Sequence, residues 1–253
     1  MTLTIYQWHQ RYQQQARWTQ NLRNYVYEQV EIKSSHRILD VGCGTGVILD
    51  ELTHLSPASL FGLDISLEAL SISKRMSPLS LDTQADALHL PFRSASFDIS
   101  LCHFVMLWIQ KPLLALQEMV RVTRGGGFIC ALAEPDYGGR IDFPPELSEI
   151  GIWQTEALRE QGANPQMGRE MRALFTGAGL QDIEVGVLGG QWRKDAASGE
   201  FELEWEVIQS DLQYKKEFVE GASELKTLEL SSRAKQQRVL FVPTFYAIGK
   251  VNR

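Results

Sequence analysis

The sequence predicts an α/β fold with a mostly parallel central sheet. From residue 37 onward, short apolar runs alternate with helix-forming stretches, an order typical of βαβ units. The apolar run 37–41 leads into a glycine loop (residues 42–46) with glycine at every second position, and the run 59–64 ends in Asp64. This order indicates a strand, a tight turn, a helix and a second strand closed by an acid.

Hydrophobic period and turn residues place the other elements. Strands are expected at 37–41, 59–64, 81–85, 97–102, 126–134, 180–188 and 239–251. Helices are expected at 46–54, 66–76, 111–123, 146–160 and 168–178, with one or two amphipathic helices over 4–31. The loop 134–145 holds three prolines and two glycines, which predicts no regular structure. Pro243 places the last strand at an edge or marks a strand start, because proline donates no hydrogen bond to a ladder.

A charged segment, 190–238, separates the last two strands. Its beginning fits a strand through the alternation of Phe201, Leu203 and Trp205, and it fits a helix through the Phe201, Trp205 and Ile208 spacing. Its length and its Gln, Glu, Lys and Leu content favour helices. We therefore expect one domain over 1–253, divided into a helical cap 1–35, a core 36–189, a helical lid 190–238 and a last strand 239–253.

Composition limits the classes of function. A formal net charge of -6 gives no support for a nucleic-acid partner, and no apolar run reaches the length of a membrane span. The N-terminus lacks the order of a signal peptide, so a cytoplasmic location is expected. Cys43, Cys102 and Cys130 have no Cys or His partner at zinc-site spacing. We expect them to be buried thiols of a reduced protein, with no structural metal.

The spacing within the glycine loop separates two classes of adenosine-cofactor enzyme. Glycine lets the chain turn sharply and lets a ligand approach the backbone, and the following helix N-terminus favours anions. A dinucleotide site uses G-x-G-x-x-G, but position 47 here is Val47. This departure counts against NAD or FAD. Asp40 before the loop and Asp64 after the next strand strengthen the pattern.

These motifs resemble the class I S-adenosylmethionine-dependent methyltransferases, in the subgroup that includes the quinone-biosynthesis enzymes. The resemblance covers about residues 36–135, and the segments that carry it are 40–46, Asp64, 85–92, 97–102 and 116–126. It implies a Rossmann-like, mostly parallel sheet with an antiparallel final strand and a helical lid. It also implies that Asp64 binds both ribose hydroxyls and that Asp86 caps the adenine amino group.

The resemblance and the strand ends together give a candidate site. The cofactor-binding candidates are Asp40, Gly42, Cys43, Gly44, Gly46, Asp64, Ile65, Asp86, Ala87, Cys102, His103 and Arg17, the last for the methionine carboxylate. His103, Tyr137 and Asp136 are the candidates for catalysis, and Glu134 is a further acid on the same loop. Each has a plain alternative: a polar loop position for His103, and turn chemistry for Asp136.

The predicted function is methyl transfer from S-adenosylmethionine to a small-molecule acceptor, by in-line displacement at the sulfonium. Positioning and exclusion of water would supply most of the catalysis. Two alternatives stay open at this point: an NAD-dependent oxidoreductase, and a non-catalytic S-adenosylmethionine-binding regulatory protein. The sequence leaves the acceptor, the methylated atom (C, O or N), any general base and the choice between monomer and homodimer undecided.

Overall fold

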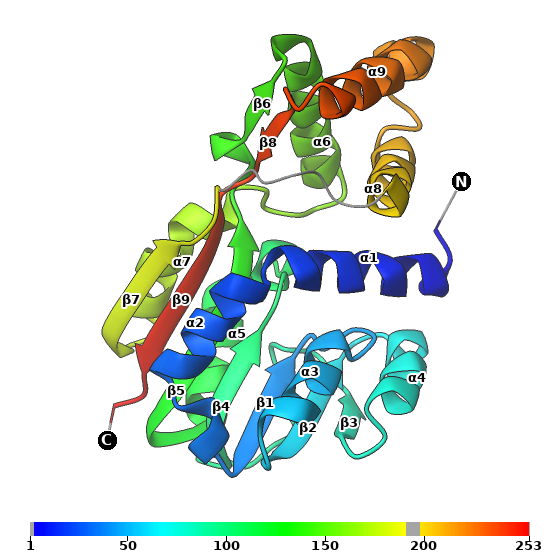
Figure 1. The fold of residues 1–253 in the computed structure, drawn as a ribbon. Helices are drawn as coiled ribbons and strands as arrows, with labels where there is room; N and C mark the ends of the chain where they lie inside the picture. Colours follow the sequence, from blue (N-terminus) through cyan, green and yellow to red (C-terminus); the bar gives the residue numbers. More distant parts are fainter. Residues whose placement is uncertain (1–2, 191–197, 253) are drawn as a thin grey trace.

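The computed structural model describes residues 3–190 and 198–252. Within these residues seven strands form a central sheet in the order β3-β2-β1-β4-β5-β9-β7 (Figure 1). The strands are β1 (Arg37–Val41), β2 (Ser59–Asp64), β3 (Leu81–Gln84), β4 (Phe97–Cys102), β5 (Thr123–Pro135), β7 (Gln181–Val187) and β9 (Thr244–Lys250). β1 to β5 are parallel, and β9 is antiparallel to both of its neighbours. The predicted fold class is confirmed.

Helices cover both faces of this sheet. They are α1 (Ile5–Trp18), α2 (Gln20–Gln29), α3 (Val47–Leu55), α4 (Leu67–Met76), α5 (Pro112–Val122), α6 (Ser148–Glu160), α7 (Met167–Gly177), α8 (Ser198–Asp211) and α9 (Lys216–Ala234). Ile38 of β1 packs with α2 and α3 on one face, whereas Leu39 packs with α5 and α7 on the other. Successive side chains of a strand point to opposite faces, so both neighbours are buried.

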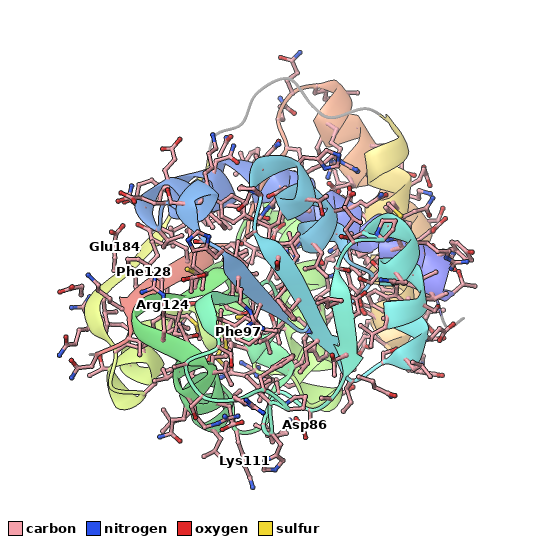
Figure 2. All side chains as sticks on the ribbon, turned by 90° about the horizontal axis from the view of Figure 1, so that it is seen from below. Asp86, Phe97, Lys111, Arg124, Phe128 and Glu184 are labelled. Carbon is pink, nitrogen blue, oxygen red and sulfur yellow. The ribbon has the colours of Figure 1, made fainter. Side chains whose placement is uncertain are left out.

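An acidic residue lies near each edge of the sheet. Figure 2 shows Glu184 of β7 near one end and Asp86, just beyond β3, near the other. Glu184 accepts a hydrogen bond from Tyr25 of α2 and another from Tyr246 of β9, each at 2.6 Å. These two bonds fasten the N-terminal helices to the sheet far from the glycine loop.

A second, two-stranded sheet lies in the stretch for which no regular structure was predicted. β6 (Ile141–Phe143) pairs with β8 (Val239–Phe241), and β5 itself continues to Pro135. That prediction was wrong because β6 depends on a partner almost a hundred residues away, which local composition does not report. The expected last strand 239–251 is likewise two strands, β8 and β9. Pro243 separates them, as a strand-start proline does.

β6, α6, α8, α9 and β8 form a small lobe (residues 141–160 and 198–241) above the sheet (Figure 1). Its own core contains Ile150, Phe201, Trp205 and Phe218. The expected lid segment 190–238 thus shares the lobe with β6 and α6, which come from the core segment 36–189. Whether the lobe moves as a lid stays a prediction, and residues 191–197 of that segment lie outside the described residues.

Helix α1 lies between the small lobe and the half of the sheet that contains β1 to β3 (Figure 1). His9 of α1 makes a 2.8 Å hydrogen bond to the Thr45 hydroxyl within the glycine loop. Across the described part of the chain, no helix combines the length and the apolar character needed to cross a bilayer. The three cysteines are buried thiols, as expected.

The last glycine of the glycine loop sets how closely two helices pack. Gly46 has φ +80° and directly precedes α3. A Cβ there would lie 2.5 Å from Ser73 Oγ and 2.9 Å from Ser73 Cα, both on α4. Only glycine therefore satisfies the left-handed backbone and the approach of α4 together.

Gly46→Ala should destabilise the protein more than Gly126→Ala does. Both glycines have φ near +80°, but a Cβ at Gly126 meets nothing within 4 Å. The control should lose roughly 1 kcal/mol from the backbone, and Gly46→Ala roughly 1–3 kcal/mol more from the clash. Urea unfolding measures both values, and equal losses would contradict the packing constraint.

Candidate functional site

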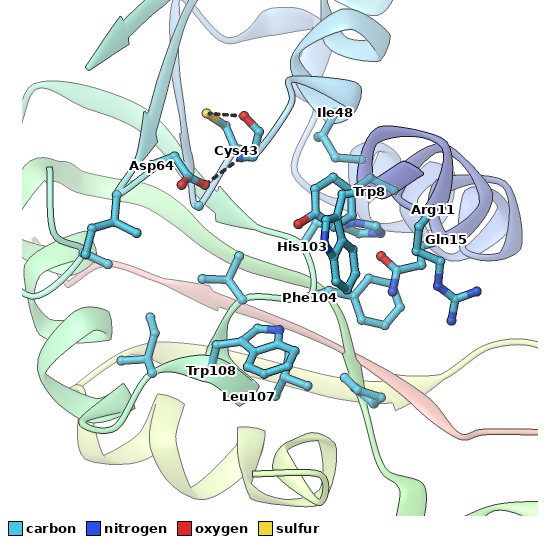
Figure 3. Close-up of a pocket in the computed structure, with 18 of the residues that line it drawn as sticks. Trp8, Arg11, Gln15, Cys43, Ile48, Asp64, His103, Phe104, Leu107 and Trp108 are labelled. Carbon is cyan, nitrogen blue, oxygen red and sulfur yellow. Dashed lines mark hydrogen bonds between the residues drawn. The ribbon is translucent and has the colours of Figure 1, made fainter. Parts of the chain in front are cut away.

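A cavity of about 700 Å³ lies at the carboxyl ends of the parallel strands, covered by α1 (Figure 3). Ligands of open α/β sheets bind at this edge, outside the carboxyl ends of the strands. Ten predicted site residues line it: Asp40, Gly42, Cys43, Gly44, Asp64, Ile65, Asp86, Ala87, His103 and Tyr137. Gly46, Cys102, Arg17 and Asp136 do not.

Asp64 joins the second strand to the glycine loop. Its Oδ2 accepts the Gly44 N–H and its Oδ1 accepts the Ser66 N–H, both at 2.8 Å. A carboxylate has about four acceptor positions, so each oxygen retains capacity for a ligand hydroxyl. The carboxylate is therefore fixed in place while it still faces the cavity.

Asp40 is a buried acid beside the same cavity. Its Oδ1 has no hydrogen-bond partner among the described residues. Burial, and then the negative charges of Asp64 and Asp82, raise the pKa of Asp40 well above its ordinary value. A positive charge placed in the cavity would stabilise all three carboxylates. This corner thus favours a cationic ligand group.

Asp86 lies at the exposed rim, two residues beyond the end of β3. Its Oδ1 accepts the Leu88 N–H at 2.9 Å, which orients the carboxylate. Ile65, also exposed, follows β2 on the same side of the cavity. An acid and an apolar side chain at one rim suit a heteroaromatic ring with an amino group.

His103 directly follows β4, and a hydrogen bond to Thr19 orients its ring. Its Nε2 lies 2.9 Å from the Thr19 hydroxyl, which donates to the Gln15 carbonyl and accepts from Arg23. The hydroxyl proton is therefore used, so Nε2 is the donor and Nδ1 carries the lone pair. Burial, and then the charge of Arg23, lower the pKa of His103 well below its ordinary value. The ring is neutral and offers an acceptor at Nδ1.

Two acids predicted near the site have structural partners instead. The buried Glu134 accepts the N–H groups of Val105, Met106 and Leu107, and so holds the turn that follows His103. Asp136 accepts from Gly138 and is bonded to Arg169 through both oxygens. Neither lines the cavity, and the contacts of Asp136 are those of a turn residue with an ion pair.

Helix α1 contributes a face of the cavity that the sequence left unassigned. Trp8, Arg11, Tyr12 and Gln15 line it, and Figure 3 shows Trp8 and Gln15 on the side of α1 that faces His103 and Phe104. Arg17, the predicted arginine, is exposed and outside the cavity. The Trp8 and Tyr12 spacing was visible in the sequence, but it did not distinguish a cavity wall from core packing.

Comparison with known proteins identifies the family. A family profile described as "Methyltransferase domain" matches residues 39–131. A demethylmenaquinone methyltransferase of Staphylococcus carnosus is 30% identical over 64% of this chain and 75% of its own. The chain belongs to the class I S-adenosylmethionine-dependent methyltransferase family.

Other relatives match a shorter part. An uncharacterized methyltransferase of Schizosaccharomyces pombe is 32% identical over 56% of this chain and 55% of its own. A demethylmenaquinone methyltransferase of Paenarthrobacter aurescens is 33% identical, over 43% of each chain. The chain thus spans about half the length of these two curated relatives.

Solved structures share the fold at low identity. A putative methyltransferase of Bacillus halodurans has a TM-score of 0.61 and 12% identity, over 91% of this chain and 99% of its own. Phosphoethanolamine N-methyltransferase 2 of Haemonchus contortus, in complex with S-adenosyl-L-methionine, has a TM-score of 0.59 and 15% identity, over 92% of this chain and 53% of its own. The methyltransferase fold thus extends over nearly the whole chain.

Glu134 gives the site a pH-dependent stability. Burial raises its pKa to about 7, although the three N–H bonds oppose the rise. The folded state then holds a proton that the unfolded state releases above about pH 4.3. The contribution of Glu134 to the unfolding free energy is therefore most favourable below that pH, and it falls by on the order of 3 kcal/mol as the pH rises toward 7.

Glu134→Gln should remove this part of the pH dependence. The variant is less stable at low pH, since one N–H loses its acceptor, but its unfolding free energy should fall less steeply between pH 5 and 7. Urea unfolding of both proteins across that range gives the two slopes. Identical slopes would show that Glu134 does not hold the proton.

Proposed function

We propose that the protein transfers the methyl group of S-adenosylmethionine to a small-molecule acceptor. The observation that carries the proposal is Asp64, which is fixed against the glycine loop and faces the first cavity at the carboxyl ends of the strands. Val47 begins α3 directly after the glycine loop, which disfavours a dinucleotide. Nothing in the site favours the oxidoreductase or the regulatory alternative.

The residues present fit this cofactor. Asp64 would accept from the ribose hydroxyls, and Asp86 from the adenine amino group. The carboxylates near Asp40 would stabilise the positive charge that both the amino group and the sulfonium carry. Gly46 would act by shaping the loop, and Cys102 lies fully buried behind it.

Bound S-adenosylmethionine supplies a methyl group on a positively charged sulfur, and the protein's part is to align a nucleophile with it. Trp8 and Tyr12 of α1 cover the cavity and limit water there. His103, neutral with its lone pair on Nδ1, would accept a hydrogen bond from a protonated group of the acceptor. Tyr137 would donate one, because burial raises the pKa of its phenol and keeps it protonated.

Asp64→Ala should weaken binding of S-adenosylhomocysteine at least about tenfold, because each charge-assisted hydrogen bond contributes roughly 1.5–3 kcal/mol. Asp86→Ala should weaken it less, because it loses a single bond to a neutral amine. Glu68→Ala, in the first turn of α4 and outside the cavity, is the matched control. Calorimetry measures all three. NAD binding more tightly than S-adenosylhomocysteine would sink the proposal.

Tyr137→Phe and His103→Ala should each lower methyl transfer roughly two- to tenfold, the effect of one lost hydrogen bond. Affinity for S-adenosylhomocysteine should stay within about twofold. A screen of methyl acceptors, with release of S-adenosylhomocysteine as the signal, first supplies a substrate. Tyr214→Phe, at an exposed position, is the control. Full turnover in both variants would mean that these side chains only support the fold.

A further inference from the structure

A second cavity, of about 370 Å³, adjoins the first beneath the small lobe. The two cavities share a wall made by six residues: Arg11, Gln15, Phe104, Pro135, Tyr137 and Gln154. The first cavity holds the predicted cofactor residues, whereas Asp40, Asp64 and Asp86 are absent from the second. A molecule in the second cavity would therefore meet the cofactor at the shared wall.

The second cavity is lined largely by aromatic and aliphatic side chains. Trp18 comes from α1, Phe201 and Trp205 from α8, and Phe241 from β8. The rings of Phe201 and Trp205 are stacked, with centroids 6.0 Å apart. Walls of this kind favour a flat aromatic molecule, because ring contacts add to the burial of apolar area.

Most of the charge around this cavity is already compensated. Three arginines and three carboxylates form a connected ion-pair network: Arg140, Arg233, Arg238, Asp142, Glu204 and Glu229. Arg238 links Asp142 and Glu229, so the network also joins the two parts of the small lobe. These six charges balance one another.

Arg11 is a cation on the shared wall outside that network. It makes no ion pair within the described residues; its Nη1 donates to Gln14 at 2.9 Å and its guanidinium lies 4.5 Å from the centre of the Trp18 ring. Burial lowers the pKa of Arg11, and the carboxylates of Glu204 and Asp211 only partly oppose this. A ligand oxyanion would provide the bond that the protein does not.

Arg11 lies where the first cavity meets the small lobe. The carboxylates that act on it, Glu204 and Asp211, both belong to α8 of the small lobe. Its neighbour Tyr12 is instead close to Asp64: burial, and then the charge of that carboxylate, raise the pKa of the Tyr12 phenol. Adjacent positions on α1 thus serve different cavities, Tyr12 the first and Arg11 the boundary.

We propose that the second cavity receives the methyl acceptor, and that this acceptor is an aromatic oxyanion. Its ring lies among the aromatic side chains of the second cavity, and its ionised oxygen is bound by Arg11 at the shared wall. The inference rests on the proposed methyl transfer, and it adds the chemical class of the acceptor.

The test uses two probes of the same shape, 2-naphthoate and the neutral 2-naphthamide, and protein saturated with S-adenosylhomocysteine. Calorimetry should show the anion binding at least about tenfold more tightly, the effect of one hydrogen bond between charged groups. Arg11→Met should remove that preference and leave affinity for S-adenosylhomocysteine within about twofold. Arg17→Met, on the same helix but outside both cavities, should change neither affinity.

A second variant tests the location. Leu188→Trp adds bulk at a partly exposed position that lines only the second cavity, and it should weaken both probes about equally. Loss of S-adenosylhomocysteine affinity in Arg11→Met would overturn the inference, since the arginine would then serve the cofactor. Absent or unselective probe binding would also overturn it. A wild-type protein that does not bind S-adenosylhomocysteine would instead refute the proposed function.

Discussion

The site depends on one carboxylate that ties two strand ends together. Asp64 closes β2 and accepts the N–H of Gly44 from the loop after β1. Because β1 and β2 are parallel neighbours, their carboxyl ends meet at one edge, and this bond fixes the loop there. Helix α1 is then held against the same loop through His9 and Thr45. The strand ends below the first cavity and the helix α1 above it are thus both hydrogen-bonded to the glycine loop.

A second buried carboxylate supports the opposite wall. Glu134 of β5 accepts three consecutive backbone N–H groups from the turn after β4. Ionising an acid in a buried position is costly, as its raised pKa shows, and the three bonds offset part of that cost. These bonds hold the loop that places His103 and Phe104 at the cavity. An acid that sequence reasoning placed among catalytic candidates is thus better explained as a support.

Sequence prediction succeeded where the signal is local. Strands β1 to β5 and β7 and helices α3, α4 and α5 lie within a few residues of their expected positions, and the glycine loop and Asp64 come together as expected. These features follow from neighbouring residues: a tight turn, a helix start and an apolar run each need only a short window. The same holds for Val47, whose position alone argued against a dinucleotide.

Prediction failed where a contact depends on distant partners or on helix rotation. β6 needs β8, and no local pattern in 134–145 reveals that pairing. On α1, Arg11 reaches the cavity and Arg17 does not. At about 100° per residue, a spacing of six residues places the two side chains on different sides of the helix. Glutamine and arginine fill both sides of this helix, so its polarity gave no indication of which side would be covered.

The two cavities therefore differ in how the chain specifies them. The first is built from consecutive strand ends between Asp40 and His103, so short sequence motifs predict which side chains line it. The second is assembled from α1, from the loop after β5, and from lobe segments that Arg238 joins across almost a hundred residues. Changes in the lobe can reshape the second cavity without moving Asp64 or the glycine loop. The proposed selection of a methyl acceptor in the second cavity would thus be physically separable from cofactor binding in the first, with Arg11 on the wall where the two cavities meet.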